Sequence, residues 1–213
     1  MDEAAWIEAA KAGDVQAFNL LVVAHQQVAY ELAFRMLRDE HAAADATQDS
    51  FLAAFTHLRQ FRGGSFRAWL LRIVLNHVYD QIRALRRHPT ESLDPLTDDE
   101  DAPVLQIADR GPTPEQVLLS REIVACIESG LQTLSPEQRA TVILCDVQGM
   151  SYEEAAAATG ANLGTVKSRL NRGRLALRAY LSRHAELLPA SLRHHFEGHE
   201  DASRSASPLA TDG

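Results

Sequence analysis

A stripe of polar side chains, three of them arginines, recurs at helical spacing between residues 72 and 87. Its members follow at steps of four, three, four and four: Arg72, Asn76, Tyr79, Arg83 and Arg87. Residues three or four apart share one face of a helix, so three guanidiniums, an amide and a phenol would lie together. Guanidiniums bind phosphates in bidentate fashion, and amide or aromatic groups can hold an unstacked base. The pattern favours binding of single-stranded nucleic acid; a solvated face with one intrahelical salt bridge is the alternative.

A pair of glycines stands just before this stripe, in the segment Arg62-Gly63-Gly64-Ser65. Adjacent glycines interrupt a helical pattern and predict a loop. A flexible basic loop beside an Arg and Asn face is suited to a nucleic-acid strand. The loop therefore favours the nucleic-acid interpretation of the stripe over the solvated one.

Residues 135–181 carry the start and stop signals of several helices. Ser135 followed by Pro136 predicts a helix start, and Ser151 with Glu154 has the spacing of a capping box. Gly160 is suited to the left-handed residue that ends a helix. A short helix, a glycine turn and a longer basic helix form the helix-turn-helix arrangement.

The longer helix of this arrangement is expected to begin at Leu163. In a helix-turn-helix protein the second helix lies in the major groove of DNA with its early residues on base edges. Lysine and arginine there contact guanine edges or phosphates. The candidate DNA-binding residues are Thr165, Lys167, Ser168, Arg169, Arg172 and Arg174. The alternative is an amphipathic helix with a solvated basic face.

The N-terminal part also has the periodicity of helices. Apolar residues recur at steps of three and four over residues 18–36, 51–61 and 66–77, and strand-like alternation is absent. A bundle of three to four helices is the expected packing.

Charge is distributed unevenly along the 213 residues, whose formal net charge is −8. Residues 89–116 hold one arginine, eight acidic residues and five prolines. Dense like charge and proline disfavour a helix or a packed core, so this stretch is expected to be a linker. It is either a solvated spacer or an acidic strip that occupies a basic groove on a partner. The predicted all-α fold therefore has two small helical domains, 1–88 and 116–184, an acidic flexible linker, 89–115, and a C-terminal extension, 185–213.

Several functional classes are disfavoured. No stretch reaches the roughly 18 apolar residues of a membrane span, and the acidic start Met1-Asp2-Glu3 is unlike a signal peptide, so a cytoplasmic protein without membrane insertion is expected. Cys126 and Cys145 lie in apolar runs and are expected to be reduced and buried. No P-loop, nucleophile elbow or HExxH motif occurs, so neither catalysis nor a cofactor is expected. The histidines His194, His195 and His199 are expected not to hold a metal.

Four motifs, in order, resemble those of the bacterial extracytoplasmic-function (ECF) sigma factors of RNA polymerase, in the sigma-70 family. Residues 14–88 are similar to region two of that family and residues 116–182 to region four. The motifs are Asp45-Ala-Thr-Gln-Asp-Ser-Phe51, Phe61-Arg-Gly-Gly64, Trp69-Leu-Leu-Arg-Ile-Val-Leu-Asn76, and Gly164-Thr-Val-Lys-Ser-Arg-Leu170 with Arg172 and Arg174.

The resemblance implies a function in transcription initiation. Region two would bind a coiled coil of the polymerase β′ subunit and capture the melted minus-ten promoter element. Region four would read the minus-thirty-five element and touch the β flap, while the linker threads the polymerase channels. An anti-sigma factor is a further implied partner.

The resemblance also assigns roles position by position. Asp45, Gln48, Asp49 and Phe51 match the helix that binds β′. Asn76 matches the position that holds a flipped base, and residues 62–65 match the loop that helps to specify it. Lys167, Ser168, Arg169 and Arg172 match the recognition helix.

The sequence departs from the family pattern at two places. Ala42-Ala43-Ala44 stands where the family has Asp-Ala-Glu, and Leu71 stands where an aromatic residue is common. A transcriptional regulator whose N-terminal bundle senses a ligand or a protein is the competing hypothesis. The Arg72 and Asn76 stripe beside the glycine loop distinguishes the two, because a sensor bundle does not need it.

Overall fold

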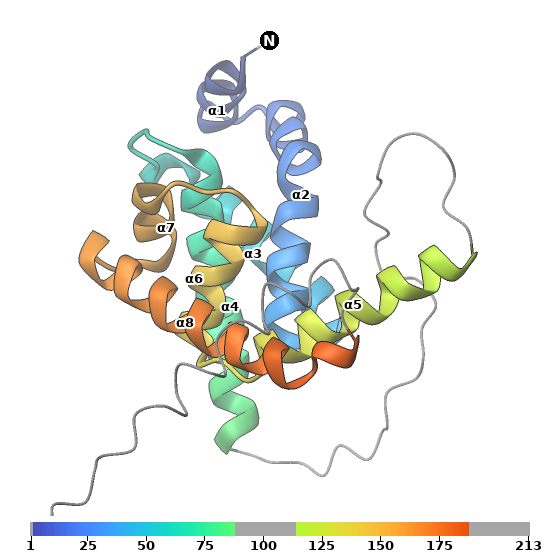
Figure 1. The fold of residues 1–213 in the computed structure, drawn as a ribbon. Coiled ribbons are helices and arrows are strands. Elements are labelled where there is room, and N and C mark those ends of the chain that lie inside the picture. The colour runs from blue at the N-terminus through green and yellow to red at the C-terminus, as the bar shows by residue number, and fades with distance from the viewer. Residues whose placement is uncertain (1, 88–113, 188–213) are drawn as a thin grey trace, which may run out of the picture. The chain divides into compact units, whose positions relative to one another are not determined.

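The computed structural model describes residues 2–87 and 114–187, and every regular element within these ranges is a helix (Figure 1). The all-α prediction is therefore confirmed for this part of the chain. The predictions for residues 89–113 and for the histidines His194, His195 and His199 concern residues outside these ranges. The α-helices are α1 Glu3–Lys11, α2 Val15–Leu37, α3 Glu40–His57, α4 Phe66–Arg87, α5 Pro114–Gln132, α6 Pro136–Val142, α7 Tyr152–Thr159 and α8 Leu163–Arg183. Shorter helical turns are η1 Leu58–Gln60, the π-helical η2 Ile143–Val147 and η3 Ala185–Leu187.

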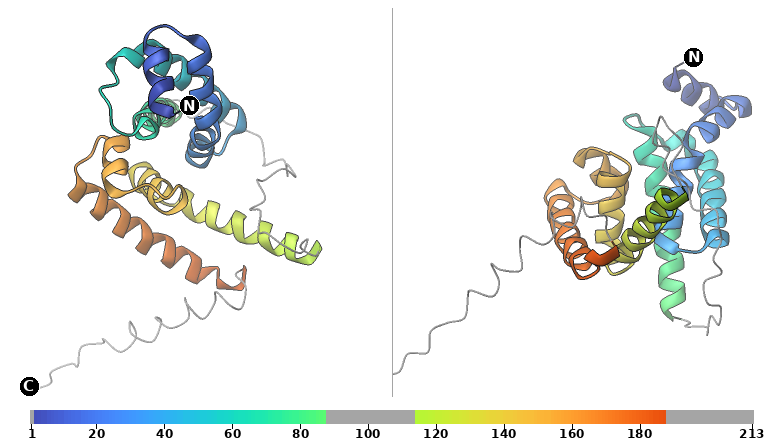
Figure 2. Two further views of the ribbon diagram at one scale, coloured as in Figure 1. Left: turned by 90° about the horizontal axis from the view of Figure 1, so that it is seen from above. Right: turned by 45° about the vertical axis from the view of Figure 1, so that its right-hand side comes forward.

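Helices α2, α3 and α4 run alongside one another, and α1 packs against α2 (Figures 1 and 2). Their core is aliphatic and closed to water: Leu21 and Leu32 of α2 and Leu70 and Val74 of α4 have no exposed surface. Burial of such side chains is the main favourable term that holds the helices together. These four helices form the bundle that the periodicity predicts.

Polar caps set the ends of the bundle helices. The side chain of Asp14 accepts hydrogen bonds from the backbone N–H groups of Gln16 (2.8 Å) and Ala17 (3.2 Å) at the start of α2. Asp39 accepts one from Ala42 (2.7 Å) at the start of α3. Arg38, between α2 and α3, has a left-handed backbone (φ 59°). This short connection therefore turns α3 back along α2.

An aromatic cluster fixes the loop before α4. The rings of Phe61, Phe66 and Trp69 lie with centroids 5.5–5.8 Å apart. Gly63 (φ 100°) and Gly64 (φ 89°) between them adopt backbone conformations that other residues rarely reach. The loop is therefore attached to the bundle at its aromatic end and turns sharply at its glycines.

By their contacts, the described residues divide into two compact units. The first contains residues 2–87 and 134–174, and the second contains residues 114–133 and 175–187. Helix α8 contributes its first part to one unit and its last part to the other. The domain boundaries expected from the sequence remain predictions.

The helix-turn-helix lies in the first unit and has the predicted capping groups. Ser135 caps α6 by accepting from the Gln138 N–H (3.3 Å). Ser151 and Glu154 form a reciprocal capping box at α7, with bonds of 3.1 Å and 3.0 Å. Gly160 ends α7 in the left-handed conformation (φ 64°). The local signals in this part of the sequence thus predict its helix ends correctly.

The second unit has its own small apolar core. Cys126 of α5 and Leu181 of α8 are buried together, and Ile123, Ile127, Leu177 and Tyr180 pack around them. Gly130 allows this close packing, because a Cβ atom there would lie 2.7 Å from a methyl carbon of Leu177. Burial raises the pKa of the Cys126 thiol, with a further contribution from Glu186. The burial that the sequence predicts for Cys126 is confirmed, whereas Cys145, expected to be buried as well, is only half-buried.

Candidate functional site

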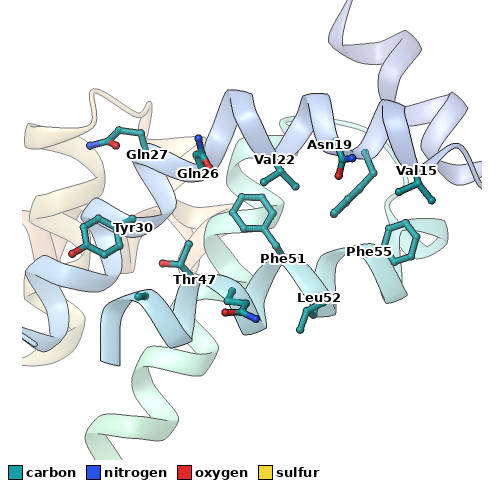
Figure 3. Close-up of a pocket in the computed structure, with 13 residues that line it drawn as sticks. Val15, Asn19, Val22, Gln26, Gln27, Tyr30, Thr47, Phe51, Leu52 and Phe55 are labelled. Atoms are coloured by element: carbon teal, nitrogen blue, oxygen red, sulfur yellow. The ribbon is translucent and has the colours of Figure 1, made fainter. Parts of the chain in front are cut away.

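A groove of about 640 Å³ lies between α2 and α3 (Figure 3). Its apolar end is formed by Val15 of α2 with Leu52 and Phe55 of α3, which are 52%, 59% and 44% exposed. The rings of Phe18 and Phe55 meet edge to face across this end, with centroids 4.9 Å apart. Large apolar side chains that remain exposed in one hollow are typical of a protein-binding surface.

The other end of the groove is polar. The amides of Gln26 and Gln27 and the phenol of Tyr30 line it from α2, and Thr47 lines it from α3 (Figure 3). Burial and the charge of Glu40 raise the pKa of Tyr30 above its ordinary value, and the phenol offers a hydrogen-bond donor to this end of the groove. The groove therefore offers an apolar half and a hydrogen-bonding half to one occupant.

The residues expected to bind the polymerase core lie on α3 beside this groove. Asp45, Gln48 and Asp49 are exposed, and Gln48 lines the groove. Phe51 lines it as well but is only 8% exposed, so its ring forms part of the floor. The structure thus brings Gln48 and Phe51 together in one hollow and leaves the two aspartates on the exposed surface of α3.

The departure at residues 42–44 alters the edge of the same groove. Ala43 is fully buried. Ala44 is exposed and lines the groove. The absence of an acidic side chain at Ala44 makes this edge more apolar.

The residues expected to hold single-stranded DNA follow the glycine loop onto α4. Arg62, Gly63 and Gly64 are exposed, and the Ser65 hydroxyl accepts from the Ala68 N–H (3.2 Å) at the helix start. A Cβ atom on either glycine would meet no atom within 4 Å, so open space surrounds the turn. The loop therefore begins α4 and leaves Arg62 at the surface.

Four side chains of the predicted stripe are exposed along α4: Arg72, Asn76, Arg83 and Arg87. Arg83 pairs with Asp80 on the same helix, which is the intrahelical salt bridge of the alternative interpretation. Both partners are about two-thirds exposed, so the pair contributes little to stability. Leu71 has no exposed surface and cannot stack on a base.

The phenol of Tyr79 is half-buried rather than open to a ligand. Burial raises its pKa to about 12, Glu137 of α6 adds to the shift, and Arg169 of α8 opposes it. Arg72 also approaches the helix-turn-helix: a Cβ atom on Gly160 would lie 3.4 Å from its Nη2 atom. Members of the two predicted DNA faces therefore lie near each other within the first unit.

The recognition helix α8 begins at a side-chain cap. The Asn162 side-chain oxygen accepts from the Thr165 N–H (2.8 Å). Val166 (0% exposed) and Leu170 (2%) hold the helix against the rest of the unit. This attachment leaves the other side of the helix open to a ligand.

The predicted DNA-binding residues of α8 differ in how open they are. Lys167, Ser168 and Arg172 are exposed, whereas Thr165 and Arg169 are half-buried. Arg174 is exposed but forms a bidentate ion pair with Asp146, with its Nε 2.9 Å from Oδ2. This hydrogen bond is the main cause of a raised Arg174 pKa. Lys167, Ser168 and Arg172 are thus exposed and open to a ligand, whereas Arg174 is paired with Asp146.

Some residues of interest were not foreseen from the sequence. Phe18 and Val22 fit the apolar periodicity of α2, and they also line the groove between α2 and α3. Arg139 (8% exposed) is among the buried charged residues, and its Nη1 donates to the Met36 backbone oxygen (2.8 Å). Its position inside an amphipathic helix gave no signal of a contact 103 residues away.

The described part of the chain contains no helix that is both long and apolar enough to cross a membrane. It also contains no cluster of three or more metal-ligating side chains.

Comparison with family models finds two matches, in the order that the motifs require. Residues 21–88 match sigma-70 region 2, and residues 125–177 match sigma-70 region 4. Both ranges consist mainly of the helices that carry the candidate sites.

Several curated proteins are similar over most of the chain. The ECF RNA polymerase sigma factor SigE of Mycolicibacterium smegmatis is 39% identical over 165 residues, which are 78% of this chain and 62% of SigE. The chain thus spans less than two thirds of that relative. The RNA polymerase sigma-H factor of Pseudomonas aeruginosa is 34% identical over 80% of this chain and 89% of its own length. The ECF sigma-E factor of Escherichia coli K12 is 33% identical over 80% of this chain and 90% of its own length.

Two solved structures have a similar fold and 28% sequence identity. CnrH, solved in complex with the cytosolic domain of CnrY, aligns with a TM-score of 0.64 over 85% of this chain and 99% of CnrH. The sigma factor RpoE of Bartonella quintana, solved with the anti-sigma factor NepR, aligns with a TM-score of 0.58 over 78% of this chain and 98% of RpoE. With both regions matched in order and the sigma-H relative covered over 89% of its length, the chain belongs to the ECF sigma factors of the sigma-70 family, non-enzymatic proteins that direct transcription initiation through regions 2 and 4.

Proposed function

We propose that this chain acts in the cytoplasm, binds core RNA polymerase and selects promoters by two contacts. In this proposal α8 reads the minus-thirty-five element and the exposed face of α4 captures the melted minus-ten element. The observation that carries it is the pair of exposed polar faces, one holding Arg72 and Asn76 on α4 and one holding Lys167 and Arg172 on α8.

The chemistry of each face suits its proposed element. Asn76 offers both a donor and an acceptor to the edge of an unpaired base, and Arg72 offers a guanidinium to the phosphate beside it. Lys167 and Arg172 stand in the first half of a helix-turn-helix recognition helix, where side chains reach the major groove. The remaining predicted contacts are Arg62, Gly63, Gly64, Ser65, Arg83, Arg87, Thr165, Ser168, Arg169 and Arg174.

The groove between α2 and α3 is the proposed site for the β′ coiled coil. A helix binds such a groove with its apolar face, and Leu52 and Phe55 present the apolar surface that it needs. Asp45 and Asp49 lie on the same helix and would pair with basic residues at the rim. Region 4 would contact the β flap.

An anti-sigma factor is a further proposed partner. The similar proteins CnrH and RpoE were solved with CnrY and with the anti-sigma factor NepR. A protein that occupied the same groove would exclude polymerase from it. We therefore propose competition for the groove, rather than modification of the chain, as the way such a partner acts.

Reconstitution with core polymerase tests the proposal. The purified chain should bind core polymerase at near-physiological salt, and the holoenzyme should start transcripts downstream of a shared pair of sequence elements. Sequencing of the transcripts would identify those elements. Absence of core binding would overturn the proposal and favour a regulator with a sensing bundle.

A further inference from the structure

Helix α1 lies outside the part of the chain that matches region 2, yet it contacts the elements around the glycine loop, residues 62–65. The region 2 match begins at residue 21, after the end of α1. Helix α1 packs against α2 and against η1, the short turn that leads into the loop. No role has so far been given to this helix, and its contacts point to the loop.

The glycine loop is held at its two ends. It connects Phe61 to Phe66, which are both buried and whose rings meet edge to face with centroids 5.8 Å apart. Between them, Gly63 and Gly64 turn through open space. Phe66 is also the first residue of α4, the helix that carries Asn76. The two rings therefore determine where the loop lies relative to Asn76.

Lys11, in the last turn of α1, contacts the first of these rings. Its Nζ atom lies 5.4 Å from the centroid of the Phe61 ring, within the reach of about 6 Å of a cation–π interaction. Glu8, one turn earlier, accepts a hydrogen bond from the same Nζ atom (2.9 Å) and so orients the ammonium group. The side chain of Lys11 is only 23% exposed, which strengthens its attraction to the ring. Lys11 thus attaches α1 to the start of the loop.

Glu3, in the first turn of α1, reaches the second ring through His25. Its Oε2 atom lies 3.3 Å from the Nε2 atom of His25 on α2. His25 is buried, and its ring lies against the ring of Phe66 with centroids 5.3 Å apart. The imidazole is therefore confined between a carboxylate of α1 and the ring that begins α4. Through it, Glu3 supports the far end of the loop.

A purely structural role for α1 is the alternative. Ile7 and Ala10 are buried, so the helix would stabilise the bundle by apolar burial alone. That role gives no reason for Lys11 and Glu3, at opposite ends of α1, to support the two rings that bound one loop. The convergence of both contacts on this loop favours a specific role over general stabilisation.

We infer that α1 positions the glycine loop for selection of the flipped base, with Lys11 and Glu3 as the positioning residues. They hold Phe61 and Phe66, and these rings hold the loop backbone beside the base that Asn76 captures. Neither positioning side chain needs to touch DNA. The part of the inference that concerns base selection rests on the proposed function.

Amide hydrogen exchange in the free chain tests the hold on the loop. The Phe61 N–H donates to the Leu58 oxygen (3.0 Å), so its exchange reports opening at the start of the loop. Lys11→Met keeps a long apolar side chain but removes the cation, and it should speed this exchange about fivefold. Lys11→Arg retains a cation over the ring and should restore slow exchange.

Arg59→Met is the matched control, because it removes an exposed cation from η1. It should leave the exchange of the Phe61 amide unchanged. A thermal melt establishes that each variant is folded. Equal exchange in the wild type and a folded Lys11→Met would overturn the inference.

Base preference of the holoenzyme tests the consequence for promoter selection. Lys11→Met and Glu3→Ala should each lower, about fivefold, the preference for the favoured base at the minus-ten position that the loop specifies. Open-complex formation on single-base promoter variants measures this preference. Preference within the minus-thirty-five element should be unchanged, and so should the affinity for core polymerase. Asp2→Ala is the control for Glu3→Ala, since Asp2 is exposed and its side chain does not cap α1.

The outcomes separate this inference from the proposed function. If the wild type does not bind core polymerase, the proposed function fails, and the role of α1 in base selection fails with it. If the wild type transcribes, a uniform loss at every promoter position in Lys11→Met would show that α1 only supports the fold. An unchanged base preference despite faster exchange would likewise overturn the inference alone. A loss confined to one minus-ten position, with rescue by Lys11→Arg, would support it.

Discussion

Asn76 and Arg169 are the two side chains whose proposed roles differ most in chemistry. Asn76 is exposed on α4 and carries no charge, so any contribution to DNA binding depends on hydrogen-bond geometry. Arg169 is half-buried on α8 and can act on a base edge or on a phosphate. Each role therefore predicts a different effect on DNA binding when the side chain is removed.

We expect Asn76→Ala to impair promoter opening more than initial binding of the duplex, because a flipped base exists only after melting. Permanganate footprinting measures opening, and a mobility shift measures binding. Gln60→Ala, which removes an exposed amide from η1, is the control. Equal losses in the two assays would rule out base capture by Asn76.

We expect Arg169→Ala to weaken recognition of the upstream element by about 1–3 kcal/mol if the guanidinium reads a base edge. The loss should be concentrated at one base pair of the element, measured by competition among single-base variants. Lys167→Ala is the comparison, as an exposed cation on the same helix. A uniform loss for Arg169→Ala across all sequences would identify it as a phosphate contact instead.

Helices α2 and α3 create a surface that neither helix has alone. Phe18 comes from one and Phe55 from the other, and their edge-to-face contact closes the apolar end of the groove. A groove of this kind tolerates changes at its exposed lining without loss of the fold, because those side chains are not part of the core. Binding and stability can therefore be separated by mutation.

We expect Leu52→Lys to lower the affinity for core polymerase at least tenfold, since it places a charge in the apolar half of the groove. Val23→Lys is the matched control: it is 68% exposed on α2 and does not line the groove. Both changes should alter the free energy of unfolding by less than about 0.5 kcal/mol. Affinity can be measured by fluorescence anisotropy of the labelled chain. Equal effects of the two variants would show that the groove is not the binding surface.

Over the molecule as a whole, features formed by residues close together in the chain could be predicted from the sequence, and contacts between distant residues could not. The caps Ser135 and Ser151 and the turn at Gly160 act within four residues, so their patterns gave the helix ends of the helix-turn-helix directly. The face of Arg72 and Asn76 followed from helical spacing in the same way. Such features depend only on local geometry.

The groove and the hydrogen bonds from Arg139 and Gln148 to helix α2 could not be predicted, because the residues that form them are far apart in the sequence. Arg139 and Met36 are 103 residues apart, and Gln148 and Val28 are 120 apart. Spacing also gave no reason for Tyr79 to be half-buried or for Arg174 to pair with Asp146. Contacts of this kind become visible only when the packing of the helices is known.

The pair between Arg174 and Asp146 has a consequence for how tightly the chain holds DNA. Asp146 lies beside a recognition helix that is otherwise rich in cations and occupies both nitrogens of a fork that would suit a phosphate. The protein thus supplies its own counter-ion at this position, so DNA releases one fewer condensed ion into solution when it binds.

We expect Asp146→Asn to steepen the dependence of promoter affinity on salt, because it frees Arg174 for a phosphate. The slope of log affinity against log salt should become more negative by about one. Titration of the holoenzyme with promoter duplex at several salt concentrations measures it, and Glu153→Gln, an exposed acid on α7, is the control. An unchanged slope would exclude this role for Asp146. If the slope steepens, one carboxylate sets how strongly promoter use responds to the ionic strength of the cell.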